Sequence, residues 1–175
     1  MGKKGGKKGK KGKKGKAPAG PSPLLLPEDV RRAAANGDLA KVTAWLDGGG
    51  AVNAMHDSPV LPDRRRTLLM ISSRKGHERF VTTLLQRGAS VNLQDANGAT
   101  ALMMAAGAGH ALVVRRLLWA GASPFICNGT GYSAEQIAEE ALHGECVATI
   151  KTHRATHAHD GTPLPSPGPG IWHGV

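Results

Sequence analysis

Histidines are the potentially catalytic side chains with the most regular spacing in this sequence. His77, His110 and His143 follow one another at a constant interval. Acid–base or nucleophilic catalysis would require a nucleophile and an orienting partner beside such a histidine, and the sequence places neither. It also contains no glycine-rich phosphate loop, nucleophile elbow or paired acid constellation. We therefore predict that these histidines pack at a repeated turn, and that the chain has no enzyme activity, catalytic residue or cofactor.

A second group of histidines could bind a metal ion. His153, His157, His159 and Asp160 are plausible ligand types, and the first two could share one face of a helix. However, we expect this segment to be frayed, with no outer hydrogen bonds to orient the ligands. A solvated tail without a metal site is the prediction.

Lysines at the N-terminus carry most of the net charge. Residues 1–16 are Met1 with nine Lys and six Gly, whereas the whole chain has a net charge of +10. One interpretation is a flexible solubilising arm; another is a salt-sensitive arm for nucleic acid or another polyanion. A membrane surface is a third, but Gly6 stands where a myristoylation motif needs Ser or Thr. The candidate polyanion-binding residues are Lys3, Lys4, Lys7, Lys8, Lys10, Lys11, Lys13, Lys14 and Lys16.

An internal repeat predicts the elements that position the remaining candidates. Residues 67–70 recur at 100–103, and Gly76-His77 recurs in the same register as Gly109-His110. A related unit precedes them at a longer offset, with extra residues between Asn53 and Thr67. A fixed period of this kind indicates copies of one unit that bury their apolar faces against each other. Threonine N-caps and turn glycines within it predict helix, turn, helix and a hairpin-like loop.

This pattern resembles the ankyrin repeat. The resemblance rests on the run 98–102, Ala105-Ala106, Gly109-His110, Leu117-Leu118 and Gly121-Ala122, and it covers about residues 28–151. It implies an all-α ankyrin-repeat solenoid of about four helix-turn-helix units, at about 28–61, 62–94, 95–127 and 128–151. We expect residues 1–27 and 152–175, which are rich in Lys/Gly and Pro, to form disordered tails.

Departures from the family pattern carry expectations of their own. Met70 and Met103 replace the histidine of the family's Thr-Pro-Leu-His motif, which predicts the loss of a polar network and of some rigidity. Leu142 replaces a turn glycine, and Lys151 stands in the last helix where the family has leucine. A charged residue there fits a terminal cap whose outer face meets water, or a decayed repeat.

The resemblance also implies where a partner would bind, namely the hairpin tips and the exposed face of each first helix. Arginines gather in the N-terminal half of this surface, so we predict contact with an acidic segment of a partner protein. The alternative is that Arg64–Arg66 are a solvated loop. The candidate partner-binding residues are Asp63, Arg64, Arg65, Arg66, Arg74, Lys75, Gln94, Ala96, Asn97, Ala99, Gly107, Ala108, Cys127, Gly129, Thr130 and Tyr132.

The predicted function is that of a non-enzymatic, monomeric adaptor or scaffold that holds one protein partner. The alternative is a polyanion-binding protein dominated by the N-terminal Lys/Gly tail. No apolar run reaches the roughly 18 residues of a membrane span. Lysines occupy the place of a signal peptide's apolar region, and the sequence has only two cysteines. Both observations favour a cytoplasmic or nuclear protein. Trp172 is either a stray residue or the anchor of a short binding motif.

Overall fold

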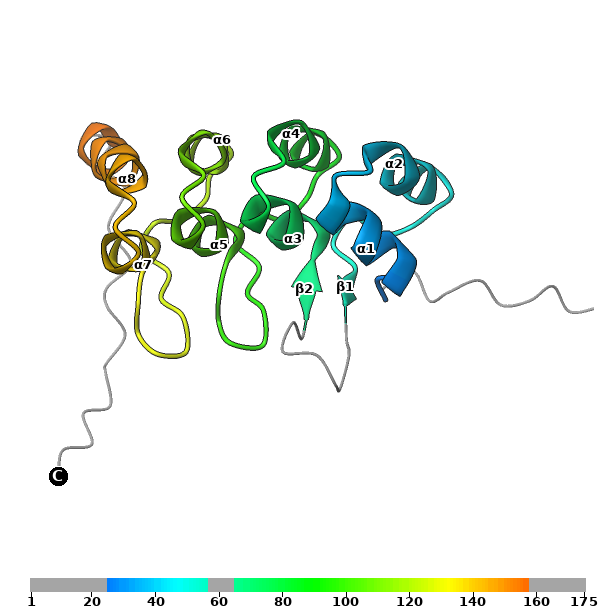
Figure 1. Ribbon diagram of the computed structural model, residues 1–175, viewed down its shortest axis with the longest axis horizontal. Helices are drawn as coiled ribbons and strands as arrows, with labels where there is room; N and C mark the ends of the chain where they lie inside the picture. The colour runs from blue at the N-terminus through cyan, green and yellow to red at the C-terminus, as the bar shows by residue number, and fades with distance from the viewer. Residues whose placement is uncertain (1–24, 57–64, 158–175) are drawn as a thin grey trace, which may run out of the picture.

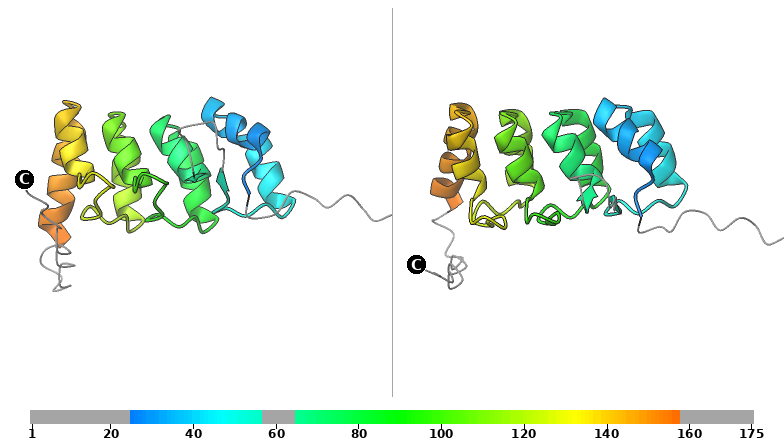
Figure 2. Two further views of the ribbon diagram at one scale, coloured as in Figure 1. Left: turned by 90° about the horizontal axis from the view of Figure 1, so that it is seen from below. Right: turned by 60° about the horizontal axis from the view of Figure 1, so that its bottom comes forward.

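Four pairs of antiparallel helices stack side by side along the described part of the chain (Figure 1). The computed structural model describes residues 25–56 and 65–157, so most of the two expected tails and Trp172 lie outside the described residues. The first helices of the pairs form one layer and the second helices form the other, and the loops between pairs project from the first layer. The same arrangement persists when the molecule is turned, with the loops along one edge of the stack (Figure 2). The predicted all-α repeat solenoid is therefore confirmed.

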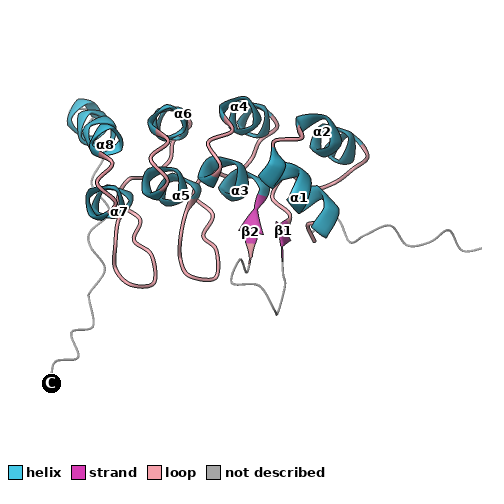
Figure 3. Ribbon diagram, in the orientation of Figure 1, coloured by secondary structure: helices cyan, strands magenta, loops and turns pink. Residues whose placement is uncertain are grey.

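The helix pairs coincide with the repeated units of the sequence, and a short hairpin lies between the first two pairs (Figure 3). That hairpin is antiparallel, with Met55 paired to Thr67 and His56 to Arg66. The elements are α1 Glu28–Asn36, α2 Leu39–Asp47, β1 Met55–His56, β2 Arg66–Thr67, α3 Leu68–Arg74, α4 Glu78–Gln86, α5 Ala101–Gly107, α6 Ala111–Trp119, α7 Ala134–Glu140 and α8 Gly144–His157.

Threonine caps begin α3 and α5, as the sequence predicts. The hydroxyl of Thr67 accepts the N–H of Met70 at 3.4 Å, and Thr100 accepts that of Met103 at 3.3 Å. Each methionine Sδ in turn accepts the threonine N–H at 3.5 Å. The methionines that replace the family's histidine therefore each provide a weak acceptor for this buried donor.

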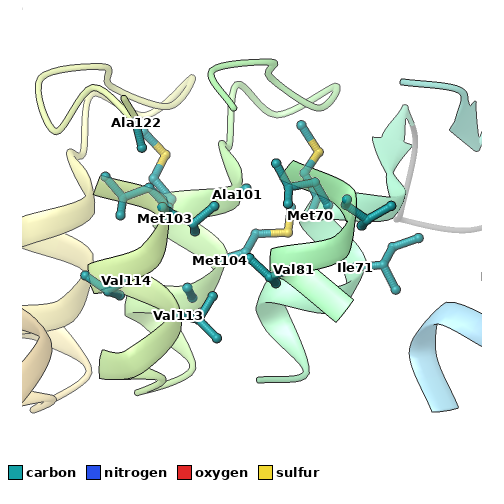
Figure 4. Packing of buried hydrophobic residues seen from close by; sticks show 14 of the residues in the cluster. Met70, Ile71, Val81, Ala101, Met103, Met104, Val113, Val114 and Ala122 are labelled. Atoms are coloured by element: carbon teal, nitrogen blue, oxygen red, sulfur yellow. The ribbon is translucent and has the colours of Figure 1, made fainter. Parts of the chain in front are cut away.

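Aliphatic side chains fill the space between the layers and between neighbouring pairs. Ala105 and Ala106 of α5 are fully buried, and such small residues let the first helices of adjacent repeats approach closely. Figure 4 shows Met70 and Ile71 of α3 and Met103 and Met104 of α5 within this continuous core. Because aromatic residues are only 3% of the sequence, aliphatic packing supplies most of the stabilisation.

The recurring histidines pack against the turn of the preceding helix pair, which confirms their predicted role. The Nε2 of His77 lies 3.2 Å from the carbonyl oxygen of Ala35, and that of His110 lies 3.1 Å from the carbonyl oxygen of Arg74. Since a carbonyl can only accept, Nε2 carries the hydrogen in both bonds. His143 takes the equivalent place against Gly109, where an added Cβ would approach its ring to 2.9 Å.

The last helix corrects one expectation. The sequence predicts an end of the repeats at residue 151 and a disordered tail from 152, but α8 continues to His157. Lys151 donates to Glu139 at 2.9 Å, and Arg154 pairs with Glu135, so both cations are anchored to α7. These pairs fit either of the two interpretations, a terminal cap or a decayed repeat. Leu142, which stands where the family has a turn glycine, adopts a φ of 60° and is 89% exposed.

Candidate partner-binding groove

A hollow of about 220 Å³ lies at the junction of the first hairpin with the first helices of repeats two, three and four. We call it the hairpin-side groove. It draws residues from β2, α3, the loop before α5, α5 itself and α7. Its lining is Arg66, Arg74, Ala99, Met103, Met104, Gly107, Ala108 and Ile137.

Two arginines form the basic edge of this groove. Arg66 forms an ion pair with Asp95, in which Nε lies 3.4 Å from Oδ2. Only 1% of the Asp95 side chain is exposed. Asp95 Oδ1 also accepts the backbone N–H groups of Asn97 and Ala99 at 2.8 and 2.9 Å. The buried Asp95 carboxylate thus holds the loop at residues 95–99 and positions the Arg66 guanidinium. Arg74 is exposed at the end of α3, and its carbonyl accepts the His110 bond described above.

Small and apolar residues form the floor. Gly107 keeps the floor open, because a Cβ at this position would lie 2.9 Å from Cγ2 of Ile137 and the isoleucine would have to shift. Met103, Met104 and Ile137 were not predicted as site residues, because apolar side chains of this kind usually lie in a core. Their spacing could have indicated this position, because Ile71, Met104 and Ile137 are equally spaced along the sequence and so occupy the same position in successive repeats.

Comparison with known proteins identifies the repeat. A family model described as ankyrin repeats (3 copies) matches residues 30–128. The chain belongs to the ankyrin-repeat family. It is 40% identical over 68 residues to the human Ankyrin repeat and KH domain-containing protein 1. It is 42% identical over 66 residues to the Drosophila melanogaster Ankyrin repeat and KH domain-containing protein mask. Each alignment covers 38% of this chain but 2% of the relative. Ankyrin repeats are generally protein–protein interaction modules.

Five of the predicted partner-binding residues line the hairpin-side groove together: Arg66, Arg74, Ala99, Gly107 and Ala108. Most of the others lie along its hairpin rim, where Ala96, Thr130 and Tyr132 are exposed. Lys75 and Arg65 are also exposed, and Arg65 adopts a φ of 59°. Asp63, Arg64 and all the candidate lysines of residues 3–16 lie outside the described residues.

Several predicted rim residues instead join neighbouring ankyrin hairpins. The Gln94 amide donates to the carbonyls of Gly98 at 2.7 Å and of Cys127 at 3.1 Å. The Gly129 N–H donates to the Asn97 carbonyl at 2.8 Å. These bonds use side-chain or main-chain groups that a partner would otherwise contact. Gln94 therefore links neighbouring hairpins through hydrogen bonds. The Cys127 thiol, in contrast, is exposed.

The second histidine group shows no metal-binding arrangement in the part of the chain that the structure describes. No set of three or more His, Cys, Asp or Glu side chains converges there. His153 and His157 do share a helical face, with ring centroids 4.0 Å apart, while His159 and Asp160 lie outside the described residues. Within the same residues, no helix is both long and apolar enough to cross a membrane.

Proposed function

We propose that this ankyrin-repeat chain is a non-enzymatic, monomeric adaptor that holds an acidic segment of a partner protein in the hairpin-side groove. One observation carries the proposal. Arg66 and Arg74 of repeat two line the same hollow as an apolar floor that repeats three and four supply. Guanidinium groups pair with carboxylates in bidentate fashion, and the floor offers apolar area to the side chains between them.

Preorganisation is the proposed mechanism. Asp95 restrains Arg66, and the main chain at Arg74 is fixed by His110, so little ordering is needed on binding. The groove spans few repeats, so we expect a contact of at most about 800 Å² per partner. A reducing compartment, cytoplasmic or nuclear, suits the exposed Cys127 thiol.

Affinity capture with charge-altered variants of the full chain tests this function. Arg74→Glu reverses the basic edge, and Ala108→Glu introduces an acid into the groove. Arg79→Glu makes the same reversal at an exposed site of α4 away from the groove and serves as the matched control. We expect a partner recovered by the unaltered chain and by Arg79→Glu to be lost with both groove variants. Equal recovery by all variants at physiological salt would refute the proposal.

The second candidate function is polyanion binding through the N-terminal lysines. It is supported by charge, because nine of the lysines behind the net charge of +10 lie within residues 1–16. Capture from nuclease-treated lysate, with the full chain and with residues 17–175, separates the two functions. An adaptor keeps its protein partner in both captures. A polyanion-binding protein loses its partners when either the tail or the nucleic acid is removed.

A further inference from the structure

A larger hollow, of about 440 Å³, lies on the opposite layer of the molecule, between the second helices of the last two repeats. We call it the α6–α8 groove; in Figure 1 these two helices lie in the layer away from the hairpins. Its walls include Leu118 and Trp119 of α6 and Ala148, Thr152 and Thr156 of α8. Trp119 is 72% exposed, so its indole ring presents a large apolar surface in this groove.

The length of α8 creates this groove. Helix α6 has 9 residues and α8 has 14, so the last turns of α8 extend past Trp119 and form a wall opposite its ring. The Arg115 guanidinium lies 5.5 Å from the centroid of the Trp119 ring, and this cation–π contact steadies the indole. Burial and the nearby His157 lower the pKa of His153, which favours its neutral form in the same wall.

The chain continues from the edge of this groove, because His157 both lines it and ends α8. The sequence that follows contains Pro163, Pro165, Pro167 and Pro169, which favour an extended polyproline II backbone. Segments of this kind bind in grooves lined by aromatic side chains. Asp160-Gly161 stands between α8 and the prolines, and this dipeptide readily forms a reversing turn.

Length and charge also suit residues 162–169 to this groove. At about 3.1 Å per residue, this stretch spans roughly 25 Å, longer than the roughly 14 Å of a nine-residue helix. It contains no charged side chain, so burying it against Trp119 removes no ion from water. We infer that residues 162–169 of the chain occupy the α6–α8 groove, with proline rings packed against Trp119. This intramolecular site is separate from the hairpin-side groove.

Nuclear magnetic resonance of the full chain tests the inference. We expect nuclear Overhauser contacts between the Trp119 indole protons and the proline ring protons of residues 163–169. Replacing the prolines at 163, 165, 167 and 169 with serine should remove these contacts and shift the Trp119 indole resonance. It should also speed amide exchange in residues 152–157 by about threefold, since the last turns of α8 lose a covering segment.

Two exposed positions of α6 supply a matched pair of variants. Trp119→Ala should reproduce the faster exchange of residues 152–157 without unfolding the repeats. Leu112→Ala should leave that exchange unchanged, because Leu112 is 50% exposed and does not line the groove. The absence of the indole contacts, or equal effects of the two variants, would overturn the inference. Contacts that arise only between differently labelled copies would overturn it too, because a second molecule, not the chain's own segment, would then fill the groove.

Discussion

Gly76→Ala should destabilise the protein through a collision with a histidine of the next repeat. Gly76 has a φ of 72°, and a Cβ there would lie 2.6 Å from the ring of His110. Gly121→Ala is the matched control, since Gly121 has a φ of 86° with no atom within 4 Å of the added Cβ. A left-handed backbone costs a non-glycine residue about 1–2 kcal/mol, partly offset by about 0.4–1 kcal/mol of lost unfolded-state entropy. By the same estimate, Gly121→Ala should cost about 1 kcal/mol.

The ring of His110 adds to this cost only at Gly76. Overpacking typically costs about 1–3 kcal/mol, and displacing the ring also weakens its bond to the Arg74 carbonyl, worth about 1 kcal/mol. We expect Gly76→Ala to cost about 3 kcal/mol in all, roughly 2 kcal/mol more than Gly121→Ala.

Urea unfolding of the full chain, followed by far-ultraviolet circular dichroism, measures both variants. Their m-values must be compared as well, because repeat arrays can lose cooperativity. In a His110→Ala background, Gly76→Ala should fall to about 1 kcal/mol, which gives a coupling energy of roughly 2 kcal/mol. If Gly76→Ala and Gly121→Ala cost the same in the natural background, the ring does not select glycine and this reasoning fails.

Three further predictions concern other buried or partly buried groups. Asp95→Asn keeps an acceptor for the hairpin N–H groups and should cost about 1 kcal/mol of unfolding free energy. Asp95→Ala should cost about 3 kcal/mol, because it leaves those donors without their carboxylate; equal costs would contradict this role. Cys127 should react promptly with a disulfide reagent in the folded protein, whereas burial raises the pKa of the Cys146 thiol and should block it until unfolding. Two rapidly reacting thiols in the native state would argue against this. The pKa of His153 lies below its ordinary value of 6.5, so the unfolded chain binds more protons in mildly acidic solution. The contribution of His153 to the stability of the end of α8 should therefore be complete above pH 6.5 and be lost as the pH falls through the lowered pKa. Amide-exchange protection of residues 152–157 should follow the same pH dependence, and His153→Gln should flatten it.

The repeat register made much of the fold predictable. Position within the repeated unit identified the caps at Thr67 and Thr100, which depend on hydrogen bonds within one helix, and the turn glycines, which have positive φ. The extension of α8 depends on other contacts. Its last turns have no apolar period, and Lys151 and Arg154 anchor them through carboxylates on α7. Partners from different helices cannot be assigned from spacing alone, so the predicted boundary at residue 151 falls too early.

The groove was partly predictable for a related reason. Gly107 and Ala108 were identified by their register, which fixes the exposed side of each first helix. Ile137 was missed because its side chain type indicates burial. In the structure it is only partly buried, since Gly107 of the preceding repeat presents no side chain to cover it. The exposure of Ile137 thus depends on Gly107 in the neighbouring repeat. Such a dependence can be recognised only when the distance between stacked repeats is known.

The same register gives the C-terminal ends of α3, α5 and α7 a gradient of charge. Arg74, Gly107 and Glu140 occupy equivalent positions in successive repeats. A positive residue, a neutral glycine and a negative residue therefore follow one another along the ends of α3, α5 and α7. An acidic segment laid across them is attracted at α3 and repelled at α7, and the apolar floor between does not distinguish its direction. Under the proposed function, the charge gradient would supply that direction, because it favours the orientation with the partner's carboxylates over Arg74 and its apolar or basic residues toward Glu140.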